Sequence, residues 1–572
     1  MNSKLYKKWQ LRAAYPSETH LQKIALGLNV QPLTARALLF RGIDSVEAAR
    51  EFLAARLQAL PDPDLLPDMS IATGRLEQAL REGERIAVHG DYDVDGISGC
   101  SLLVETLRHM GGEVEYHIPL RLKDGYGLSA EAIRQARGNG CRLLVSVDCG
   151  VSAIEEADLA SELGLDLIVT DHHQPSERLP SCLALINPHL SGNQFPWKEL
   201  SGVGVAFLLL AGLRRRLRES GYFSNHPEPD LRKGLDLVAL GTIADIVPLG
   251  GVNRILVRAG LDRLEHSVRP GINALKKVAE VKEVSCGAVG FRLAPRLNAA
   301  GRLEDAALGV KLLLSETSEE SSQLAELLDG FNRSRQKIEQ QTLEQAIELV
   351  VNQHCEERYS LVLADERWHS GVIGIVASRL VERYHCPVVM IALADGQGKG
   401  SARSITNFHL YKALHACESS LLGYGGHAMA AGMSIAQSAV DEFRRQFDMV
   451  ARNALSSDDL IPRLLYDGET ELHELSLEQI QELESLSPFG SGNPQPAFVS
   501  RQVKVLTPKI VGTTHLRFDV EQQGVRFGCI AFGMAERIDE LSVTVDILYR
   551  PGINKWRGQS SVQLQIADFS PA

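Results

Sequence analysis

A short apolar run that leads directly into three alternating aspartates constrains this chain most. Residues 86–88 (Ile, Ala, Val) have the composition of a buried strand, and Asp91, Asp93 and Asp95 follow at once. Residues 98–110 then carry apolar side chains at helical spacing. Because carboxylates crowded at a strand end repel one another, this pattern favours a bound Mg²⁺ or Mn²⁺ with oxygen ligands. The alternative is a solvated turn whose aspartate only caps the helix.

Strand-like runs alternate with helix-length segments over residues 70–250. The predicted strands are 85–88, 114–118, 143–147, 167–169 and 183–186, and the segments between them include 130–137 and 153–163. This alternation predicts βαβ units and a mostly parallel sheet. Ligands of such sheets bind outside the carboxyl ends of the strands, so the polar residues there should share one chemistry.

Carboxylates and imidazoles do follow several of these strands. The residues after the first, third and fourth strands and after an apolar helix predicted over 235–244 are His89, Asp91, Asp93, Asp95, Asp148, Asp171, His172, His173 and Asp245. Any one of them could be a helix cap or an ordinary polar residue. Four segments with the same chemistry at one predicted edge indicate a metal site instead.

Length and composition narrow the class of protein. At 572 residues the chain is too long for one core, and we expect three or four domains. The formal net charge of −12 argues against a protein that coats nucleic acid, but not against an enzyme with one basic groove. No apolar run reaches membrane-spanning length, no secretory signal is visible, and the nine cysteines lack paired spacing. We therefore expect reduced thiols and a cytoplasmic location.

Two further segments carry weaker signals. Residues 304–353 predict one or two long helices, because Gly330 and the polar run 332–337 allow a break. Arg333, Arg335 and Lys337 in that run favour a solvated face over a substrate channel. Residues 202–206 resemble a fragment of a dinucleotide fingerprint, but no strand precedes them, so we expect close helix packing.

A second α/β segment is predicted over residues 355–455, with strands at 361–363 and 388–391. Its glycine-rich stretch 396–404 is predicted to be a loop, and residues 425–432 form a second stretch of glycines and small residues. Glycines beside Ser, Arg and His let the backbone approach an anion while the side chains donate hydrogen bonds. Glycine-rich turns are common, so this pattern alone identifies no ligand.

Short β-rich runs fill the C-terminal part of the chain. The predicted strands are 502–506, 516–520, 525–532, 543–549 and 561–566, with turns that include 523–524 and 551–552. Five strands of this length predict a small barrel, and the OB-fold is favoured. The candidates for stacking on nucleic-acid bases are Arg517, Phe518, Phe527, Tyr549 and Trp556. Most of these aromatic rings must fill the core, so we expect only one or two to stack.

These motifs together resemble the DHH phosphoesterase superfamily and, within it, the RecJ single-strand DNA exonucleases. The stretches that carry the resemblance are 89–96, 119–121, 124–128, 147–150, 170–173, 242–249, 295–302, 400–404 and 425–432. Only the N-terminal extension lacks a recognisable motif. The resemblance implies an α/β chain with a parallel-sheet DHH domain, a long connecting helix, a second α/β DHH-associated domain and a C-terminal OB-fold β-barrel. The implied bounds are 1–65 for the N-terminal extension, 66–265 for the DHH catalytic domain, 266–354 for the helical connector, 355–460 for the DHH-associated substrate-binding domain, and 461–572 for the OB-fold domain with its helical lead-in.

The resemblance also implies a site for two ions, Mn²⁺ or Mg²⁺. The implied metal ligands are Asp93, Asp95, Asp148, His172, Asp245 and His89, with Asp95 and Asp148 as bridging candidates. The residues assigned to catalysis are His173, at the scissile phosphate or leaving group, Asp148, and Asp91, which like Asp171 orients ligands. The residues assigned to the substrate and its 5′-phosphate are Arg121, Arg296, Asn298, Ser401, Arg403 and His427.

The function implied by this family is 5′-to-3′ degradation of single-stranded DNA to 5′-mononucleotides, in DNA repair and recombination. A helicase and a single-strand-binding protein are the implied partners. A DHH-type phosphodiesterase for short oligonucleotides or cyclic dinucleotides is the alternative, which the chain length and the barrel disfavour. A non-catalytic scaffold is disfavoured because every expected ligand position is filled. No motif in the sequence indicates recognition of a 2′-hydroxyl, so the sequence does not distinguish DNA from RNA as the substrate.

Overall fold

The computed structural model describes residues 7–119, 127–352, 358–556 and 558–572, and the chain forms two compact units. The sheet–barrel unit comprises Leu11–Asp329 and Tyr466–Ala572, and the central unit comprises Met1–Gln10 and Gly330–Leu465. The division between them falls inside one helix, α15 (Ser318–Asn352). The domain boundaries expected from the sequence stay predictions.

A five-stranded parallel sheet begins the sheet–barrel unit. Its strands are β2 (Arg85–Gly90), β3 (Glu113–His117), β4 (Leu143–Val147), β5 (Asp166–Thr170) and β6 (Ala184–Ile186). They lie in the order β3-β2-β4-β5-β6, which confirms the predicted parallel sheet. After β2 the chain goes to one side for β3 and then to the other side for β4. The carboxyl ends of β2 and β4 therefore flank the point where the strand order reverses, the usual place for a ligand in such sheets.

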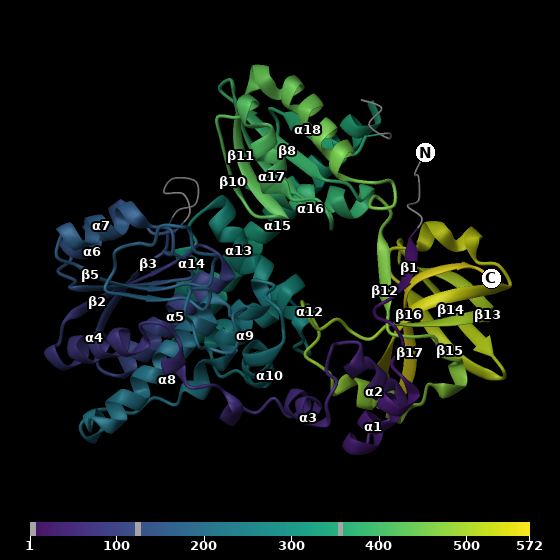
Figure 1. Cartoon of the computed structure of the whole chain (residues 1–572), viewed down its shortest axis with the longest axis horizontal. Helices are drawn as coiled ribbons and strands as arrows, with labels where there is room; N and C mark the ends of the chain where they lie inside the picture. Colours follow the sequence, from purple (N-terminus) through teal and green to yellow (C-terminus); the bar gives the residue numbers. More distant parts are fainter. Residues whose placement is uncertain (1–6, 120–126, 353–357, 557) are drawn as a thin grey trace. The chain divides into compact units, whose positions relative to one another are not determined.

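Helices cover both faces of this sheet (Figure 1). On one face lie α6 (Ala130–Gly138) and α7 (Ile154–Glu162), which share a core with the strands. On the other face lie α4 (Met69–Glu82), α5 (Val94–His109), α8 (Gly202–Glu219) and α9 (Leu235–Ala244). The predicted helix at 235–244 is confirmed as α9, whose side chains are buried all round. Among the described residues, no helix combines the length and apolarity needed to cross a bilayer.

A series of helices follows the sheet, and the last one is long. They are α10 (Gly251–Glu265), α11 (Pro270–Val278), α12 (Cys286–Ala288), the π-helix η5 (Val289–Leu293), α13 (Ala294–Leu303), α14 (Ala307–Leu314) and α15. Helix α15 runs unbroken through the polar run, where Arg335 bonds to Glu339 (3.1 Å) and Asn332 (3.0 Å). The expected solvated face is wrong for Arg335, which is buried because this pairing satisfies its charge, whereas Arg333 and Lys337 are exposed.

The sheet of the central unit corrects the prediction of a glycine-rich loop at 396–404 and also includes much of the glycine-rich stretch 425–432. Its strands are β7 (Leu361–Asp365), β8 (Val388–Ala394), β9 (Gln397–Arg403), β10 (Gly423–Gly426) and β11 (Ala430–Ala436), in the order β10-β11-β9-β8-β7. Helices α16 (Ile373–Tyr384), α17 (Leu410–Ala416) and α18 (Val440–Ala454) accompany it. Most of both stretches is strand. The glycines of β9 allow close packing, since a Cβ at Gly398 would lie 2.5 Å from Ile391 and one at Gly400 would lie 2.6 Å from Met433.

The C-terminal strands form the predicted barrel. They are β13 (Phe498–Val511), β14 (His515–Gln522), β15 (Val525–Ala531), β16 (Thr544–Trp556) and β17 (Gln559–Pro571), and they close in the order β13-β14-β15-β17-β16. The turn expected at 551–552 is wrong. Pro551 and Gly552 lie inside β16, where they stay in register with β17.

The N-terminal helices share a core with the barrel. They are α1 (Glu18–Leu28), α2 (Pro32–Leu39) and α3 (Val46–Ala54), and α19 (Leu477–Glu484) leads into the barrel beside them. A short strand pair, β1 (Lys8–Leu11) with β12 (Arg463–Tyr466), completes the secondary structure. The buried Arg254 of α10 donates to the carbonyls of Phe52 (2.7 Å) and Leu486 (2.9 Å). This guanidinium therefore links α10, the N-terminal helices and the lead-in to the barrel.

Candidate metal centre

Aspartates and histidines from four segments meet beyond the carboxyl ends of β2, β4 and β5. The described residues contain three groups of possible metal ligands. Within each group, the ligand atoms lie within 4.8 Å of one another. The groups are Asp148 with His172 and His173, Asp95 with His172 and Asp245, and Asp91 with Asp93 and Asp148. The structure thus brings together the strand-end residues that the sequence placed at one edge.

The first turn of α8 holds the carboxylate of Asp95. Asp95 is buried in the first turn of α5 and accepts hydrogen bonds from the backbone N–H groups of Gly202 (2.6 Å) and Val203 (2.9 Å). A helix N-terminus favours a negative charge at this position. Burial nevertheless raises the pKa of Asp95 to about 7, and the charge of Asp93 adds to the shift. The two backbone donors therefore compensate only part of the cost of burial.

Glycines make room for these carboxylates. A Cβ at Gly202 would lie 2.6 Å from the Cβ and 2.7 Å from Oδ1 of Asp148, and a Cβ at Gly241 would lie 2.7 Å from Oδ1 of Asp95. The expectation of close packing at 202–206 is confirmed, but the sequence did not reveal that the packing partner is the candidate metal centre itself. Asp148 also has a φ of 65°, a left-handed conformation that costs a non-glycine residue free energy and is common at functional sites.

Asp171 orients the two histidines that follow it. Its Oδ1 accepts hydrogen bonds from the backbone N–H of His172 (2.7 Å) and from Nδ1 of His173 (2.8 Å), and its Oδ2 accepts from the backbone of Val151 (2.9 Å). Burial raises the pKa of Asp171, but the bonds to His173 and the backbone outweigh it and leave the pKa below its usual value. This geometry fits the orienting role expected for Asp171.

The two histidines differ in protonation. Burial lowers the pKa of His172 to about 4, so its imidazole is neutral, the form that binds metals. Its Nε2 lies 3.1 Å from Oδ1 of Asp148. Burial also lowers the pKa of His173, but the hydrogen bond and the charge of Asp171 raise it to about 9 overall. His173 is therefore a cation at neutral pH.

The unsatisfied atoms of the cluster fit a divalent cation. Oδ1 of Asp91, Oδ1 of Asp148 and Nε2 of His172 are buried without a hydrogen-bond partner in the described part of the chain. Burial and neighbouring aspartates raise the pKa of Asp91 to about 8, that of Asp245 to about 9, and that of Asp148 well above its usual value. A cation with mixed oxygen and imidazole ligands would supply both the missing partner and the missing positive charge.

Two other expected ligands have additional contacts. Asp93 caps α5, because its Oδ1 accepts from the backbone N–H of Asp95 (2.9 Å) and Gly96 (3.2 Å). Asp93 is thus both a helix cap and a member of a ligand group. His89 is fully buried, with Nε2 3.1 Å from the carbonyl of Gly127 and its ring stacked on His117. Among the described residues, His89 falls outside the three ligand groups.

The expected substrate residues in the sheet–barrel unit lie on α13. Oδ1 of Asn298 accepts a hydrogen bond from the backbone N–H of Val94 (3.2 Å), so α13 abuts the acidic turn. Arg296 pairs with Asp329 (2.9 Å) and donates to the carbonyl of Arg292 (2.5 Å), so its guanidinium is held within the fold. Arg121, the third expected residue, lies outside the described residues.

In the central unit, Ser401 and Arg403 lie on β9 and face the first turn of α16. Nη1 of Arg403 donates to Oγ of Ser401 (3.3 Å). A Cβ at Gly374 of α16 would lie 2.9 Å from Oγ of Ser401 and 3.1 Å from Nη2 of Arg403. His427 is exposed after β10, and its backbone N–H donates to Ala430, the residue paired with Arg403 across the sheet. A helix N-terminus beside Ser and Arg donors is suited to binding a phosphate.

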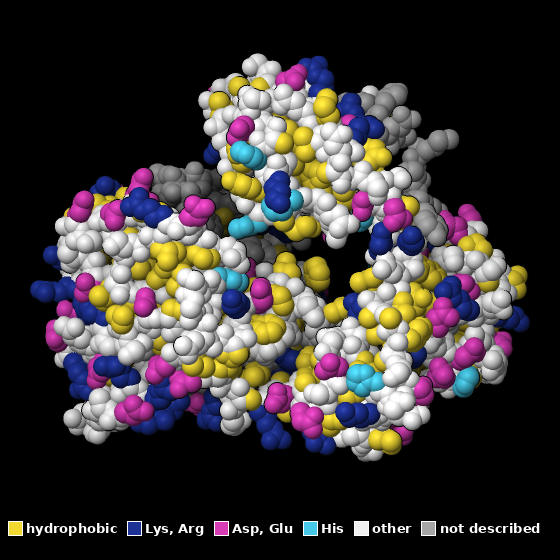
Figure 2. Space-filling view, in the orientation of Figure 1, with side chains coloured by type: hydrophobic (Ala, Val, Ile, Leu, Met, Phe, Trp, Pro, Cys, Tyr) yellow, Lys and Arg dark blue, Asp and Glu magenta, His cyan; other side chains and the backbone are white. Residues whose placement is uncertain are grey.

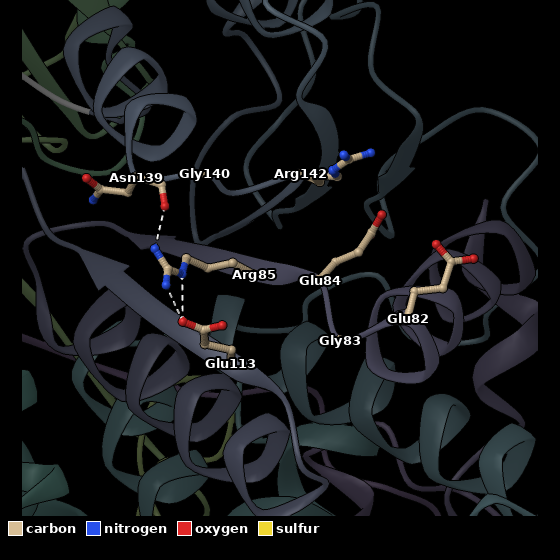
Figure 3. A pocket seen from close by; sticks show the side chains of 8 residues that line it. All are labelled: Glu82, Gly83, Glu84, Arg85, Glu113, Asn139, Gly140 and Arg142. Atoms are coloured by element: carbon tan, nitrogen blue, oxygen red, sulfur yellow. Dashed lines mark hydrogen bonds and ion pairs between the residues drawn. The ribbon is translucent and has the colours of Figure 1, made fainter.

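A hollow of about 580 Å³ lies at the end of the parallel sheet opposite to the metal centre (Figure 3). It surrounds the amino ends of β2 and β3 and the residues just before β4. Its Arg85 points to Glu113 and to the carbonyl of Asn139, and it bonds to both. With its arginine already paired, this hollow offers less chemistry than the carboxylate cluster at the other edge.

Acidic partners balance the basic run at the C-terminal end of α8. Figure 2 shows Lys and Arg side chains beside acidic ones on this part of the surface. Arg214 and Arg218 pair with Glu228, Arg215 pairs with Asp62 and Asp64, and Arg216 pairs with Glu77. This basic run is therefore not a free surface for nucleic acid.

The barrel places the aromatic candidates for base stacking in different environments. Phe518 and Tyr549 are buried in the barrel core. Phe527 is half-buried and Arg517 is exposed. The side chain of Trp556 lies outside the described part of the chain. The expectation that most of these rings fill the core therefore holds for Phe518 and Tyr549.

Comparisons with known proteins agree with this architecture. Family profiles match residues 85–242 (DHH family, N-terminal domain), 357–453 (DHHA1 domain) and 466–568 (RecJ OB domain). The chain is 40% identical over 587 residues to the single-stranded-DNA-specific exonuclease RecJ of Dickeya dadantii, and the match covers 98% of this chain and 99% of that protein. It is 37% identical over 569 residues to RecJ of Bacillus subtilis, covering 98% of this chain and 70% of that one.

Solved structures agree as well. The crystal structure of RecJ from Thermus thermophilus in complex with Mn²⁺ matches with a TM-score of 0.84 and 32% identity, over 99% of this chain and 80% of that chain. The same protein in complex with Mg²⁺ matches with a TM-score of 0.79. These matches confirm the expected fold class, and the chain belongs to the RecJ family of single-stranded-DNA-specific exonucleases.

Proposed function

We propose that the metal centre of this chain hydrolyses single-stranded DNA from the 5′ end and releases 5′-mononucleotides. The observation that carries the proposal is the cluster of buried carboxylates and imidazoles whose unpartnered atoms fit a divalent cation. Family membership supports the single-stranded DNA substrate. The metal is Mn²⁺ or Mg²⁺, the two ions held by the solved RecJ structures.

The candidate ligands suggest how the chain would hold two ions. The residues that would bind them are Asp93, Asp95, Asp148, His172 and Asp245, and we propose Asp95 and Asp148 as the carboxylates that both ions would share. When bound, a pair of divalent ions neutralises the phosphate, activates the attacking water and stabilises the leaving oxygen. His173 is cationic beside Asp171, and we assign it the donation of a hydrogen bond to the scissile phosphate or the leaving oxygen.

The central unit would recognise the 5′-phosphate. Arg403 offers a guanidinium fork, Ser401 a hydroxyl, and the first turn of α16 its backbone N–H groups. Arg403→Ala should raise KM for 5′-phosphorylated oligomers more than for 5′-hydroxyl oligomers. Arg445→Ala, at an arginine 72% exposed in the same unit, is the control. If Arg403→Ala and the wild type degraded both oligomers equally well, this phosphate pocket would be refuted.

The family context extends the proposal to partners. We infer a role in DNA repair and recombination, in the cytoplasm, with a helicase that supplies single strands and a single-strand-binding protein that covers them. A purified helicase should then increase degradation of a blunt duplex that the chain alone leaves intact. Failure of several candidate helicases to do so would count against this part of the proposal.

The direct test is digestion of single- and double-stranded oligomers labelled at either end, with Mn²⁺ or with EDTA. We expect labelled mononucleotide to appear first from 5′-labelled single strands, and only with Mn²⁺. Asp148→Ala should abolish turnover yet still bind single strands in Ca²⁺. Equal loss of turnover and binding would remove Asp148 from its assigned role, and a preference for dinucleotides over long strands would support the phosphodiesterase alternative.

A further inference from the structure

Phe291 is the most exposed aromatic side chain among the described residues. It is 85% exposed, compared with 53% for Tyr15 and for Phe532. Its neighbour Arg292 is also exposed. A single exposed phenylalanine is not in itself unusual on a protein surface, so what matters is where this ring lies in the fold.

The local backbone directs this ring outward. Phe291 lies in the middle of the π-helix η5, whose first and last residues, Val289 and Leu293, are 0% and 1% exposed. These two side chains anchor the turn in the core, so the residue midway between them faces away from it. Gly290 has open space around it and adds no covering side chain. π-Helical turns are rare and are often found at functional sites.

The same segment continues directly to the metal centre. Seven residues after Phe291, Asn298 bonds to the backbone of Val94 in the acidic turn, at 3.2 Å. A Cβ at Gly301 would lie 2.9 Å from the carbonyl of Tyr92 in that turn. Seven helical residues span roughly 10 Å at 1.5 Å each, about the length of three nucleotides at 3.4 Å per step. A base near Phe291 would therefore lie within a few nucleotides of the scissile bond.

We propose that Phe291 is a substrate-binding residue that stacks on a nucleobase of the single strand, with Arg292 beside it to contact the strand's phosphates. The inference rests on the proposed function and adds a recognition element to it. Stacking on an aromatic ring is tolerant of sequence and requires an unpaired base, because paired bases are already stacked in a duplex. This contact would thus favour single strands over double strands independently of the phosphate pocket.

The test uses 5′-phosphorylated single strands that carry one 2-aminopurine at each of the first six positions in turn, bound in Ca²⁺. In the wild type we expect fluorescence quenching at one position or at two neighbouring ones. Phe291→Ala should abolish that quenching, and Phe291→Tyr should retain it. In Mn²⁺, Phe291→Ala should raise KM roughly 5- to 150-fold, the equivalent of one stacked base, with a smaller change in kcat at saturating DNA.

Val268→Ala is the matched control, since Val268 is 84% exposed in the same unit and has no aromatic ring. It should keep wild-type quenching and KM, and no variant should change Tm because both side chains lie in solvent. If Phe291→Ala matched Val268→Ala in quenching and KM, the inference would be overturned. A role of the ring in docking another protein would give this result. If the wild type itself failed to degrade single strands in Mn²⁺, the proposed function would fail instead.

Discussion

Replacing Gly202 by alanine tests whether α8 positions the candidate metal ligands. The new Cβ would lie 2.7 Å from Oδ1 of Asp148, whereas ordinary van der Waals contact begins at 3.4 Å. The carboxylate must therefore retreat by about 0.7 Å, the difference between the two distances. Metal–ligand distances tolerate only about 0.2 Å, so Asp148 would leave its ligand position. Alanine keeps the backbone N–H, and the hydrogen bond to Asp95 can persist.

The expected result is a loss of metal affinity larger than any loss of stability. Disturbed support of metal ligands typically lowers affinity about 10- to 100-fold. Overpacking costs about 1–3 kcal/mol of folding free energy. Titration of the metal-free protein with Mn²⁺, followed by calorimetry or electron paramagnetic resonance, measures the affinity, and urea unfolding measures the stability.

Gly212→Ala on the same helix is the control. The nearest atoms to its new Cβ would be the sulfur of Met69 and Cγ2 of Thr73, both at 3.4 Å, an ordinary contact. This variant adds the same methyl group to α8 without the close approach and should bind Mn²⁺ as the wild type does. If Gly202→Ala also bound Mn²⁺ with wild-type affinity, the close approach of α8 to Asp148 would be irrelevant to the site.

Three further outcomes follow from buried charges, two of them in the metal centre and one outside it. Burial raises the pKa of Asp245 from 3.8 to about 9, so between these values the folded protein binds more protons than the unfolded chain. The metal-free protein should therefore lose stability in urea as the pH rises toward 9, and Asp245→Asn should reduce that loss; a pH-independent difference between the two would refute it. Asp171→Asn should lower the pKa of His173 from about 9, as measured by NMR titration of the metal-free protein. Asp236→Ala leaves the buried Arg269 without one of its partners and should cost about 3 kcal/mol in urea unfolding while Mn²⁺ affinity stays unchanged.

The sequence predicted the parallel sheet and its carboxylate edge because both depend on local pattern. Each strand of that sheet is a short apolar run, and most of the candidate ligands follow a strand within a few residues, whereas Asp245 follows the apolar helix α9. Strand order then places those residues together without any further information. The hydrogen bonds from α8 to Asp95 could not be predicted in this way, since they join residues more than a hundred positions apart and use backbone groups that carry no sequence signature.

The errors arose where tertiary packing overrides a local preference. Glycine has a low strand propensity, so β9 was expected to be a loop, but its glycines accept the side chains of Ile391 and Met433. The polar run of α15 was expected to face solvent, but the charge of Arg335 is satisfied by Glu339 one turn away and the pair is buried. For β9 the deciding side chains come from neighbouring strands, whereas for Arg335 the partner is close in sequence and only the burial of the pair depends on the rest of the fold.

The polar atoms of the centre divide into those that the protein satisfies and those that it leaves for a cation. Asp171 and Asp95 accept hydrogen bonds from the backbone, which fixes them in place. Asp148 and His172 each keep a buried atom that has no hydrogen-bond partner among the residues that the structure describes. The donors that we propose for the 5′-phosphate, Arg403 and Ser401, lie in the central unit outside these ligand groups. Loss of Asp148 should thus remove hydrolysis and spare recognition of the 5′-phosphate, whereas loss of Arg403 should do the reverse. If either substitution removed both hydrolysis and 5′-phosphate recognition, the two would depend on one shared element.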